Sequence, residues 1–216
     1  MAPRIGMNIL SLDSSSPVAS VALLSITEGG SEILFREDTP HARSDSSVLF
    51  IALEKVVAVC GAPEALCVGL GPGSYNGLRA GIAAARGFAT ALGAPLHAIP
   101  SPLALPGPNS GFWAVGDARG GHYWIACVRG GAFLGEPRLL SPQEAIAHAV
   151  TRPDLPILAS APLAGFETIT VATPCAARLA ILAEKNDPLY LVSLTPEPLY
   201  LKPPHITSPK ATTPAR

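Results

Sequence analysis

The sequence is poor in charged residues. Asp, Glu, Lys and Arg make up 14% of its 216 residues, and the formal net charge is −1, whereas an average soluble domain carries about 25% charged residues. The chain therefore has no basic excess to replace the counterions of a nucleic-acid backbone, which excludes an obvious nucleic-acid binder. Hydrophobic residues make up 48% of the chain. This excludes an intrinsically disordered protein, because so much apolar surface can offset the entropy of ordering.

Long apolar runs and paired metal ligands are lacking as well. No stretch of about 18 uncharged apolar residues occurs, so we expect no membrane span. Residues 1–7 lack the apolar centre of a signal peptide, and we expect a cytoplasmic protein. The 4 cysteines form no CxxC pair and the 5 histidines follow no zinc-site spacing. We therefore expect small buried cysteines and no metal site.

The apolar runs that are present predict an α/β protein. An opening meander of strands is followed by alternating helices and strands, and residues 106–111 have the Pro/Gly-rich composition of a linker. Ser141 and Glu144 have the spacing of a capping box, which predicts that a helix starts at Pro142. We predict strands over 8–12, 18–26, 31–37, 65–70, 96–99, 112–115, 122–128, 134–140 and 155–159, and helices over 46–60, 78–92, 142–150 and 174–186.

This pattern divides the chain into an N-terminal lobe (1–105), a shortened C-terminal lobe (106–202) and an extended Pro-rich tail (203–216). An internal near-repeat relates the lobes, because Asp13 and Asp117 each end a predicted strand and an alanine follows nine residues later in both copies. The repeat predicts a duplicated α/β fold with a cleft between its halves, although such a strand–turn–strand unit can also arise by chance. The two aspartates either face a metal or nucleotide or close their own turns.

Residues 71–77, here called the glycine loop, lie between a predicted strand and a predicted helix. Glycines, polar side chains and a following helix N-terminus are features of an anion-binding loop. Neither nucleotide fingerprint is complete, because no Lys follows Gly77 and only the first half of G-x-G-x-x-G is present. The alternative, which we favour, is a rigid turn that packs the helix onto the sheet or onto a partner. The candidate anion or nucleotide contacts are Gly71, Pro72, Gly73, Ser74, Tyr75, Asn76 and Gly77, with Asp13 and Asp117.

The helix predicted after the loop is rich in small residues. A helix of this kind is usually buried against a sheet, and the alternative is a flat interface with another subunit. Arg79 and Arg86 are its only charged residues, and their spacing of seven places them on nearly the same face. The residues predicted for a partner interface are Leu78, Arg79, Gly81, Ile82, Ala85 and Arg86.

Together these segments resemble the TsaB family, the dimerisation subunits of bacterial tRNA threonylcarbamoyladenosine synthesis. Residues 69–82 resemble the family's G-P-G-S-[FY]-T-G-[VL]-R loop and helix start, with Asn76 in place of Thr. Residues 8–23 resemble the family's opening hairpin, and Asp117-Ala-Arg119 with Tyr123 resembles its D-A-R…Y hairpin. Residues 198–202 resemble its closing P-x-Y-L-R, so the similarity spans residues 8–202.

The resemblance implies a duplicated ribonuclease H-like, or actin-like ATPase, fold with two lobes of mixed sheet and helices. It implies a non-catalytic scaffold for a TsaD-type catalytic subunit, which transfers the threonylcarbamoyl group to an adenosine beside the tRNA anticodon. A TsaE-type ATPase joins that complex. The chain alone is expected to form a homodimer and to meet tRNA only through the complex.

The resemblance also bears on cofactors. It implies that this chain requires none, while ATP, ADP and Mg²⁺ can serve the complex. TsaB relatives usually have His-Ser where this chain has Asp45-Ser46, so no histidine metal ligand is expected there, and no catalytic residue is assigned. The alternative that the residues leave open is an active ATPase or phosphotransferase of the actin-like class, using Asp13, Asp117 and the glycine loop.

Overall fold

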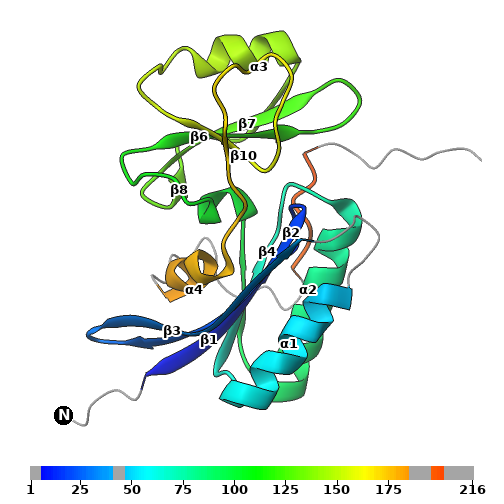
Figure 1. Ribbon diagram of the computed structural model, residues 1–216, viewed down its shortest axis with the longest axis vertical. Helices are drawn as coiled ribbons and strands as arrows, with labels where there is room; N and C mark the ends of the chain where they lie inside the picture. Colours follow the sequence, from blue (N-terminus) through cyan, green and yellow to red (C-terminus); the bar gives the residue numbers. More distant parts are fainter. Residues whose placement is uncertain (1–5, 41–46, 185–195, 202–216) are drawn as a thin grey trace, which may run out of the picture.

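The computed structural model describes residues 6–40, 47–184 and 196–201. Within them the chain forms two lobes, each built on a mixed sheet, with the first lobe below the second in Figure 1. The predicted tail, 203–216, and Asp45-Ser46 lie outside the described residues.

The first sheet has the strand order β3-β2-β1-β4-β5. Its first three strands form the predicted antiparallel meander, and β4 and β5 add to β1 in parallel. The strands are β1 (Met7–Asp13), β2 (Val18–Thr27), β3 (Gly30–Pro40), β4 (Ala65–Gly69) and β5 (Leu96–Ile99), the helices α1 (Ser47–Cys60) and α2 (Tyr75–Leu92), and the 3₁₀ turn η1 (Ser101–Ala104).

Alternation along the strands of the first sheet decides which helices cover each face. Leu10 and Leu12 of β1 pack with Leu49 and Ile82 under α1 and α2. Ile9, the residue before Leu10, points to the opposite face. Because successive strand side chains point to opposite faces, one apolar run supplies both cores.

The second sheet has the order β11-β10-β6-β7-β8, with β9 also paired to β7. The helix predicted from its capping box covers one face, and Ser141 and Glu144 make both hydrogen bonds of that box. Of the strand predicted over 134–140 only Arg138–Leu140 forms, as β9, and the two short strands β8 and β11 were not predicted. The elements are β6 (Phe112–Asp117), β7 (Tyr123–Arg129), β8 (Ala132–Phe133), β9 (Arg138–Leu140), α3 (Pro142–Ala149), β10 (Ile157–Ala159) and β11 (Thr170–Val171).

The two sheets repeat one topology. In each, an antiparallel hairpin is extended by a third antiparallel strand on one side and by two parallel strands on the other. This confirms the predicted duplicated, ribonuclease H-like fold class. The alanine repeat is out of register, however, because Ala22 pairs with Ser11 whereas Ala126 pairs with Ala114, one position further from its aspartate.

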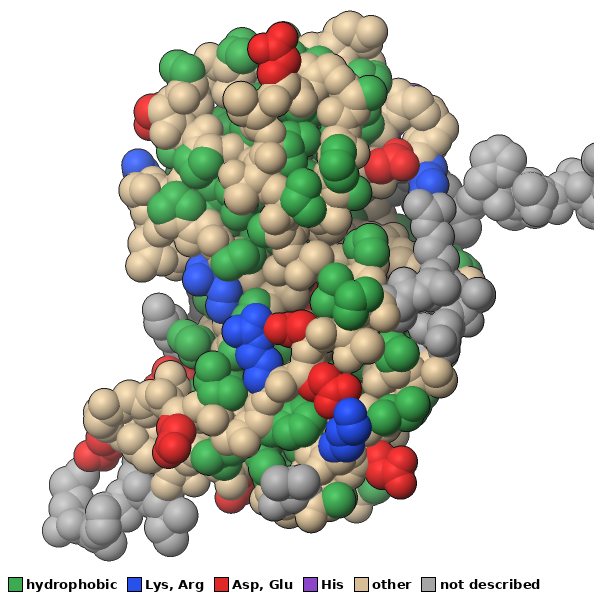
Figure 2. Space-filling view, in the orientation of Figure 1, with side chains coloured by type: hydrophobic (Ala, Val, Ile, Leu, Met, Phe, Trp, Pro, Cys, Tyr) green, Lys and Arg blue, Asp and Glu red, His purple; other side chains and the backbone are tan. Residues whose placement is uncertain are grey.

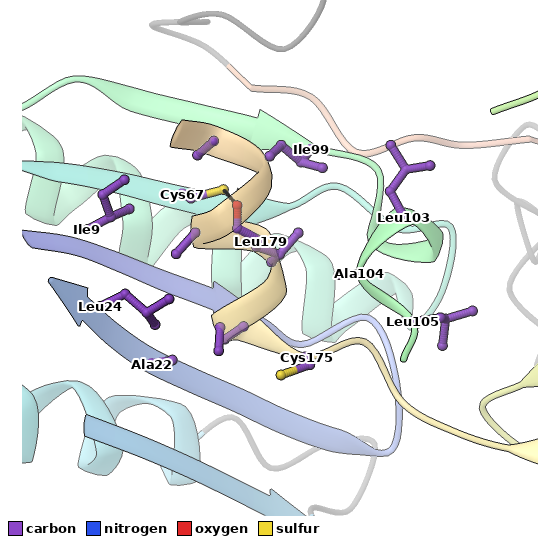
Figure 3. Packing of buried hydrophobic residues seen from close by; sticks show 14 of the residues in the cluster. Ile9, Ala22, Leu24, Cys67, Ile99, Leu103, Ala104, Leu105, Cys175 and Leu179 are labelled. Atoms are coloured by element: carbon purple, nitrogen blue, oxygen red, sulfur yellow. Dashed lines mark hydrogen bonds between the residues drawn. The ribbon is translucent and has the colours of Figure 1, made fainter. Parts of the chain in front are cut away.

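After β11 the chain returns to the first lobe as α4 (Ala176–Glu184), which packs against β1, β2 and β4 on the face opposite α1 and α2. Figure 3 shows Leu179 of α4 among Ile9, Leu24 and Ile99 of the first sheet. The Ser11 hydroxyl donates to the Ala176 carbonyl (2.6 Å), and the Ala176 N–H donates to the Ser20 hydroxyl (2.9 Å). Two buried serines thus fix the start of α4 on the sheet.

The cysteines and the helix lengths bear on two expectations from the composition, small buried cysteines and no membrane span. All four cysteines are free; Cys67, Cys127 and Cys175 are buried and Cys60 is half-buried. In the described part of the chain, no helix has the length and apolar character needed to span a bilayer.

Candidate functional site

The glycine loop packs against the turn between β1 and β2, residues 13–16, here called the serine turn. The Ser74 N–H donates to the Ser15 carbonyl (2.7 Å), and the Ser14 hydroxyl donates to the Gly77 carbonyl (2.8 Å). A Cβ atom at Gly73 or Gly77 would collide with the backbone of the serine turn. These glycines are therefore needed so that two backbone segments can approach closely.

Three of the loop's N–H groups donate to acceptors inside the protein. Gly71 donates to the Ser101 hydroxyl (2.9 Å), Ser74 to the Ser15 carbonyl (2.7 Å) and Gly77 to the Ser74 hydroxyl (3.3 Å). Ser74 is thus the N-cap of α2, and the helix begins at Tyr75, three residues before the predicted start at 78. The close approach of Gly73 and Gly77 to the backbone of the serine turn favours the packing alternative. A nucleotide contact at the loop stays a prediction.

Asp13 is fully buried at the end of β1. Its Oδ1 accepts the Ser15 N–H (2.9 Å) and the Ser15 hydroxyl (2.6 Å), which closes the serine turn. Its Oδ2 is buried and accepts no hydrogen bond of ordinary geometry from the described residues, and a Cβ at Gly69 would collide with it. Burial raises the pKa of Asp13 above its ordinary value, while the Ser101 and Ser15 hydroxyls oppose that rise.

Asp117 occupies the corresponding position in the second lobe but has different surroundings. It is exposed, its Oδ1 accepts the Arg119 N–H (2.7 Å), and its Oδ2 lies 3.7 Å from the Arg119 guanidinium. It therefore closes its own turn, as the alternative interpretation of the sequence allowed. In the described residues, no hydrogen bond or ion pair joins Asp117 to Asp13 or to the glycine loop.

The residues predicted for a partner interface on α2 require a correction. Leu78, Gly81, Ile82 and Ala85 are buried against this chain's own sheet and serine turn, so they present no surface to a partner. Only the remaining two residues, Arg79 and Arg86, are exposed. Alanine and glycine occur on both sides of α2, and hydrophobicity alone therefore could not tell its inner face from its outer face.

The exposed side of α2 instead forms one wall of a groove that sequence reasoning missed. The groove lies between α1 and α2, has a volume of ≈ 540 Å³ and is lined without any charged or hydrogen-bonding side chain. The available signal was α1, whose exposed Phe50, Ile51 and Val57 extend its apolar surface beyond one stripe. The residues lining the α1–α2 groove are Phe50, Val57, Ala62, Pro63, Ala83, Ala84, Gly87, Phe88, Ala91 and Leu92.

An aromatic and cationic cluster lies at the N-terminal end of α2. The Tyr75 and Tyr200 rings stack with centroids 5.6 Å apart and planes 26° apart, and the Arg79 guanidinium carbon lies 4.9 Å from the Tyr75 ring centroid. The Leu199 N–H donates to the Leu70 carbonyl (2.8 Å), which holds the closing segment beside the glycine loop. We call Tyr75, Arg79 and Tyr200 the Tyr–Arg cluster.

The described residues contain no group of three or more His, Cys, Asp or Glu side chains placed to hold a metal ion. In the view of Figure 2, charged side chains lie on both lobes, and hydrophobic side chains form separate patches among them.

Comparison with solved structures decides the fold. A Pseudomonas aeruginosa protein described as similar to peptidase YeaZ superposes with a TM-score of 0.72 at 21% identity, covering 91% of this chain and 100% of that one. YeaZ from the same organism gives 0.69 at 22% identity, covering 90% and 100%. The chain has the YeaZ fold.

Sequence comparisons are more local. The sequence model of the family TsaD, tRNA N6-adenosine threonylcarbamoyltransferase, matches residues 41–105. An uncharacterised Mycobacterium leprae protein is 34% identical over 103 residues, 47% of this chain and 28% of that protein. An uncharacterised Mycobacterium tuberculosis protein is 30% identical over 116 residues, 51% of this chain and 54% of that protein. The matched region thus spans about half or less of these relatives' length.

Proposed function

We propose that this chain is a TsaB-type scaffold subunit that binds a TsaD-type catalytic subunit in the synthesis of N6-threonylcarbamoyladenosine next to the tRNA anticodon. The observation that carries the proposal is the α1–α2 groove, an apolar surface on two neighbouring helices. The YeaZ fold and the sequence motifs that resemble the TsaB family support it.

The groove has the chemistry of a protein-binding surface. Small-molecule sites are mostly apolar but carry a few placed polar groups that orient the ligand, whereas the side chains lining this groove carry none. A groove between two helices suits the apolar face of a partner helix, and the small side chains of Ala83, Gly87 and Ala91 allow close approach. The segment matched by the TsaD family model, 41–105, includes both helices of the groove.

The same geometry favours the function of a scaffold and argues against that of an actin-like ATPase or phosphotransferase. Asp13 is fully buried beneath the serine turn, and the glycine loop packs closely against that turn. Titration calorimetry of the isolated chain with ATP and Mg²⁺ separates the two. We expect no submicromolar binding and no turnover, and tight binding with turnover that Asp13→Asn abolishes would establish the ATPase instead.

Co-expression with the TsaD-type protein of the same host tests the scaffold directly. Wild-type chain should co-purify with that protein, and Ala83→Glu should abolish the association because it places a charge in the apolar groove. Thr90→Glu is the matched control, since Thr90 is exposed on the same helix but does not line the groove. Equal association of both variants with the partner would refute the groove as the binding surface.

The remaining members of the assembly are proposed from the resemblance. We propose that a TsaE-type ATPase joins the complex, that tRNA is met only through it, and that the isolated chain forms a homodimer through the same groove. Light scattering should then give a dimer for the wild-type chain and a monomer for Ala83→Glu. A wild-type monomer at micromolar concentration would contradict the homodimer while leaving the TsaD-type partner to be tested separately.

A further inference from the structure

One stripe of α2 joins the Tyr–Arg cluster to the groove. Tyr75, Arg79, Ala83, Gly87 and Ala91 follow one another at intervals of four, so each neighbours the next along a ridge that winds slowly around the helix. The last three line the α1–α2 groove, and the first two are exposed at its N-terminal end. A partner that lies along the groove therefore meets the Tyr–Arg cluster where the apolar lining ends.

Among the described residues no acidic side chain forms an ion pair with Arg79, and this includes Glu197, three residues before Tyr200. Exposed Arg36, Lys55 and Arg119 each have an ion pair, whereas Arg86 and Arg152, like Arg79, have none among the described residues. No acidic residue occurs between 65 and 116, so neither α2 nor its neighbouring strands β4 and β5 supply one. The guanidinium lies over the Tyr75 ring, which holds its position without consuming its hydrogen-bond donors.

Tyr200 reinforces that arrangement from the far end of the chain. Its ring stacks on Tyr75, and the segment that carries it is anchored by the Leu199–Leu70 hydrogen bond and by Leu201 against the core. Both tyrosines remain 42–44% exposed. The two stacked rings therefore hold the Arg79 side chain in place at the surface. Because the side chain is already ordered, it loses less entropy when its guanidinium binds a carboxylate.

We propose that the Tyr–Arg cluster fixes the orientation of the TsaD-type partner by binding an acidic side chain of that partner, with Arg79 as the donor. The inference rests on the proposed function and adds the chemistry of the contact. An apolar groove can bind a partner helix in either of two opposite orientations. A single guanidinium at one end of the groove favours the orientation that brings an acidic side chain to it. Arg79 is thus a specificity-determining residue, and Tyr75 and Tyr200 position it.

Surface plasmon resonance with the immobilised TsaD-type protein tests the charge. Arg79→Glu should raise the dissociation constant by about tenfold or more, because it leaves the partner's carboxylate facing a like charge. Arg152→Glu makes the same charge change at an exposed site of the second lobe and should leave the constant within about threefold. Replacing the facing partner carboxylate with Lys should restore binding of the Arg79→Glu chain.

Two outcomes overturn the inference without touching the proposed function. In one, Ala83→Glu abolishes binding while Arg79→Glu behaves like Arg152→Glu, so that the groove binds the partner and Arg79 takes no part. In the other, Arg79→Glu leaves the two-protein complex intact but weakens its binding of tRNA, so that the guanidinium faces a phosphate. If the wild-type chain does not bind the TsaD-type protein at all, the proposed function itself fails.

The positioning role of the tyrosines has its own readout. Tyr200→Phe keeps the stacked ring and should match the wild-type dissociation constant. Tyr200→Ala removes the outer ring and should weaken binding by a factor of a few, and this loss should disappear when Arg79 is already Gln. An equal loss from Tyr200→Ala in both backgrounds would show that Tyr200 does not act through Arg79.

Discussion

The two lobes share one strand order but bury their sheets differently. Every strand of the second sheet is shorter than its counterpart: β2 and β3 have 10 and 11 residues, and the matching β7 and β9 have 7 and 3. In the first lobe the 18-residue α2 connects β4 to β5, whereas the described residues 160–169 connect β10 to β11 without a helix. The first lobe also receives α4 on its second face.

The difference shows that a duplicated topology need not carry a duplicated function. Strand order is set by how the chain connects, while surface chemistry is set by which helices cover the sheet. The groove and the Tyr–Arg cluster both depend on α2, whose place the second lobe leaves without a helix in its described residues. The second half of the chain returns α4 and Tyr200 to the first lobe.

The largest expected effect comes from breaking the α4 contact with the first sheet. Leu179 is fully buried between them, so Leu179→Ala should lower the free energy of unfolding by about 2–5 kcal/mol through lost burial and a residual cavity. Urea unfolding measures it. The control is Leu134→Ala in the second lobe, where a side chain 46% exposed should matter by less than about 1 kcal/mol. Similar losses in both variants would contradict the dependence of the first lobe on α4.

Two glycine substitutions in α2 should change the free energy of unfolding by smaller amounts and in opposite directions. Gly77→Ala should cost about 1–3 kcal/mol, because the added Cβ collides with the Ser14 carbonyl. Gly87→Ala should instead gain about 0.5–1 kcal/mol, because the position is helical and a Cβ there meets open space. Thermal unfolding of both variants under one condition checks the pair, and a stabilising Gly77→Ala would show that the serine turn does not pack on the loop.

The buried Asp13 predicts a pH dependence of the first lobe. Its pKa is raised in the folded state, so the folded chain holds the proton at a pH where the unfolded chain, with a pKa near 3.8, has released it. The contribution of Asp13 to stability therefore falls as the pH rises above that value. As the pH rises from 4 to about 7, the free energy of unfolding of Asp13→Asn should increase relative to that of wild type. Urea titrations at each pH measure this difference. A difference that shrinks over this range would contradict a protonated Asp13.

The smallest effect belongs to the counterpart aspartate. Asp117→Asn should change the free energy of unfolding by less than about 0.5 kcal/mol, because the residue is exposed and its pairing with Arg119 is screened by water. The same urea titrations serve as the measurement. A change in the free energy of unfolding as large as that found for Asp13→Asn would mean that the two aspartates are equivalent.

The fold was largely predictable because its signals are local. Alternating apolar runs gave the meander of β1, β2 and β3, and the capping box gave the start of α3 at Pro142. Even the missed start of α2 had a local signal, since Ser74 is a good N-cap residue. The two-residue β11 could not be predicted, because a pair of exposed residues carries no period.

The candidate site was harder because it depends on distant contacts. Ala83 and Ala85 are chemically identical, yet Ala83 lines the groove and Ala85 is fully buried, a difference that only the packed sheet decides. The stacking of Tyr200 on Tyr75 joins residues 125 positions apart. Spacing within one helix predicts which residues share a side, but not which side faces the core.

The return of α4 has a consequence for the order in which the chain can fold. The face of the first sheet that carries Ile9, Leu24 and Cys67 is covered by residues 176–184. During synthesis this face of the first sheet stays uncovered until residues 176–184 have been made, after every strand of the second sheet. Such long-range contacts slow folding and prolong the exposure of apolar surface. The first lobe therefore completes its core only after the second sheet has been synthesised.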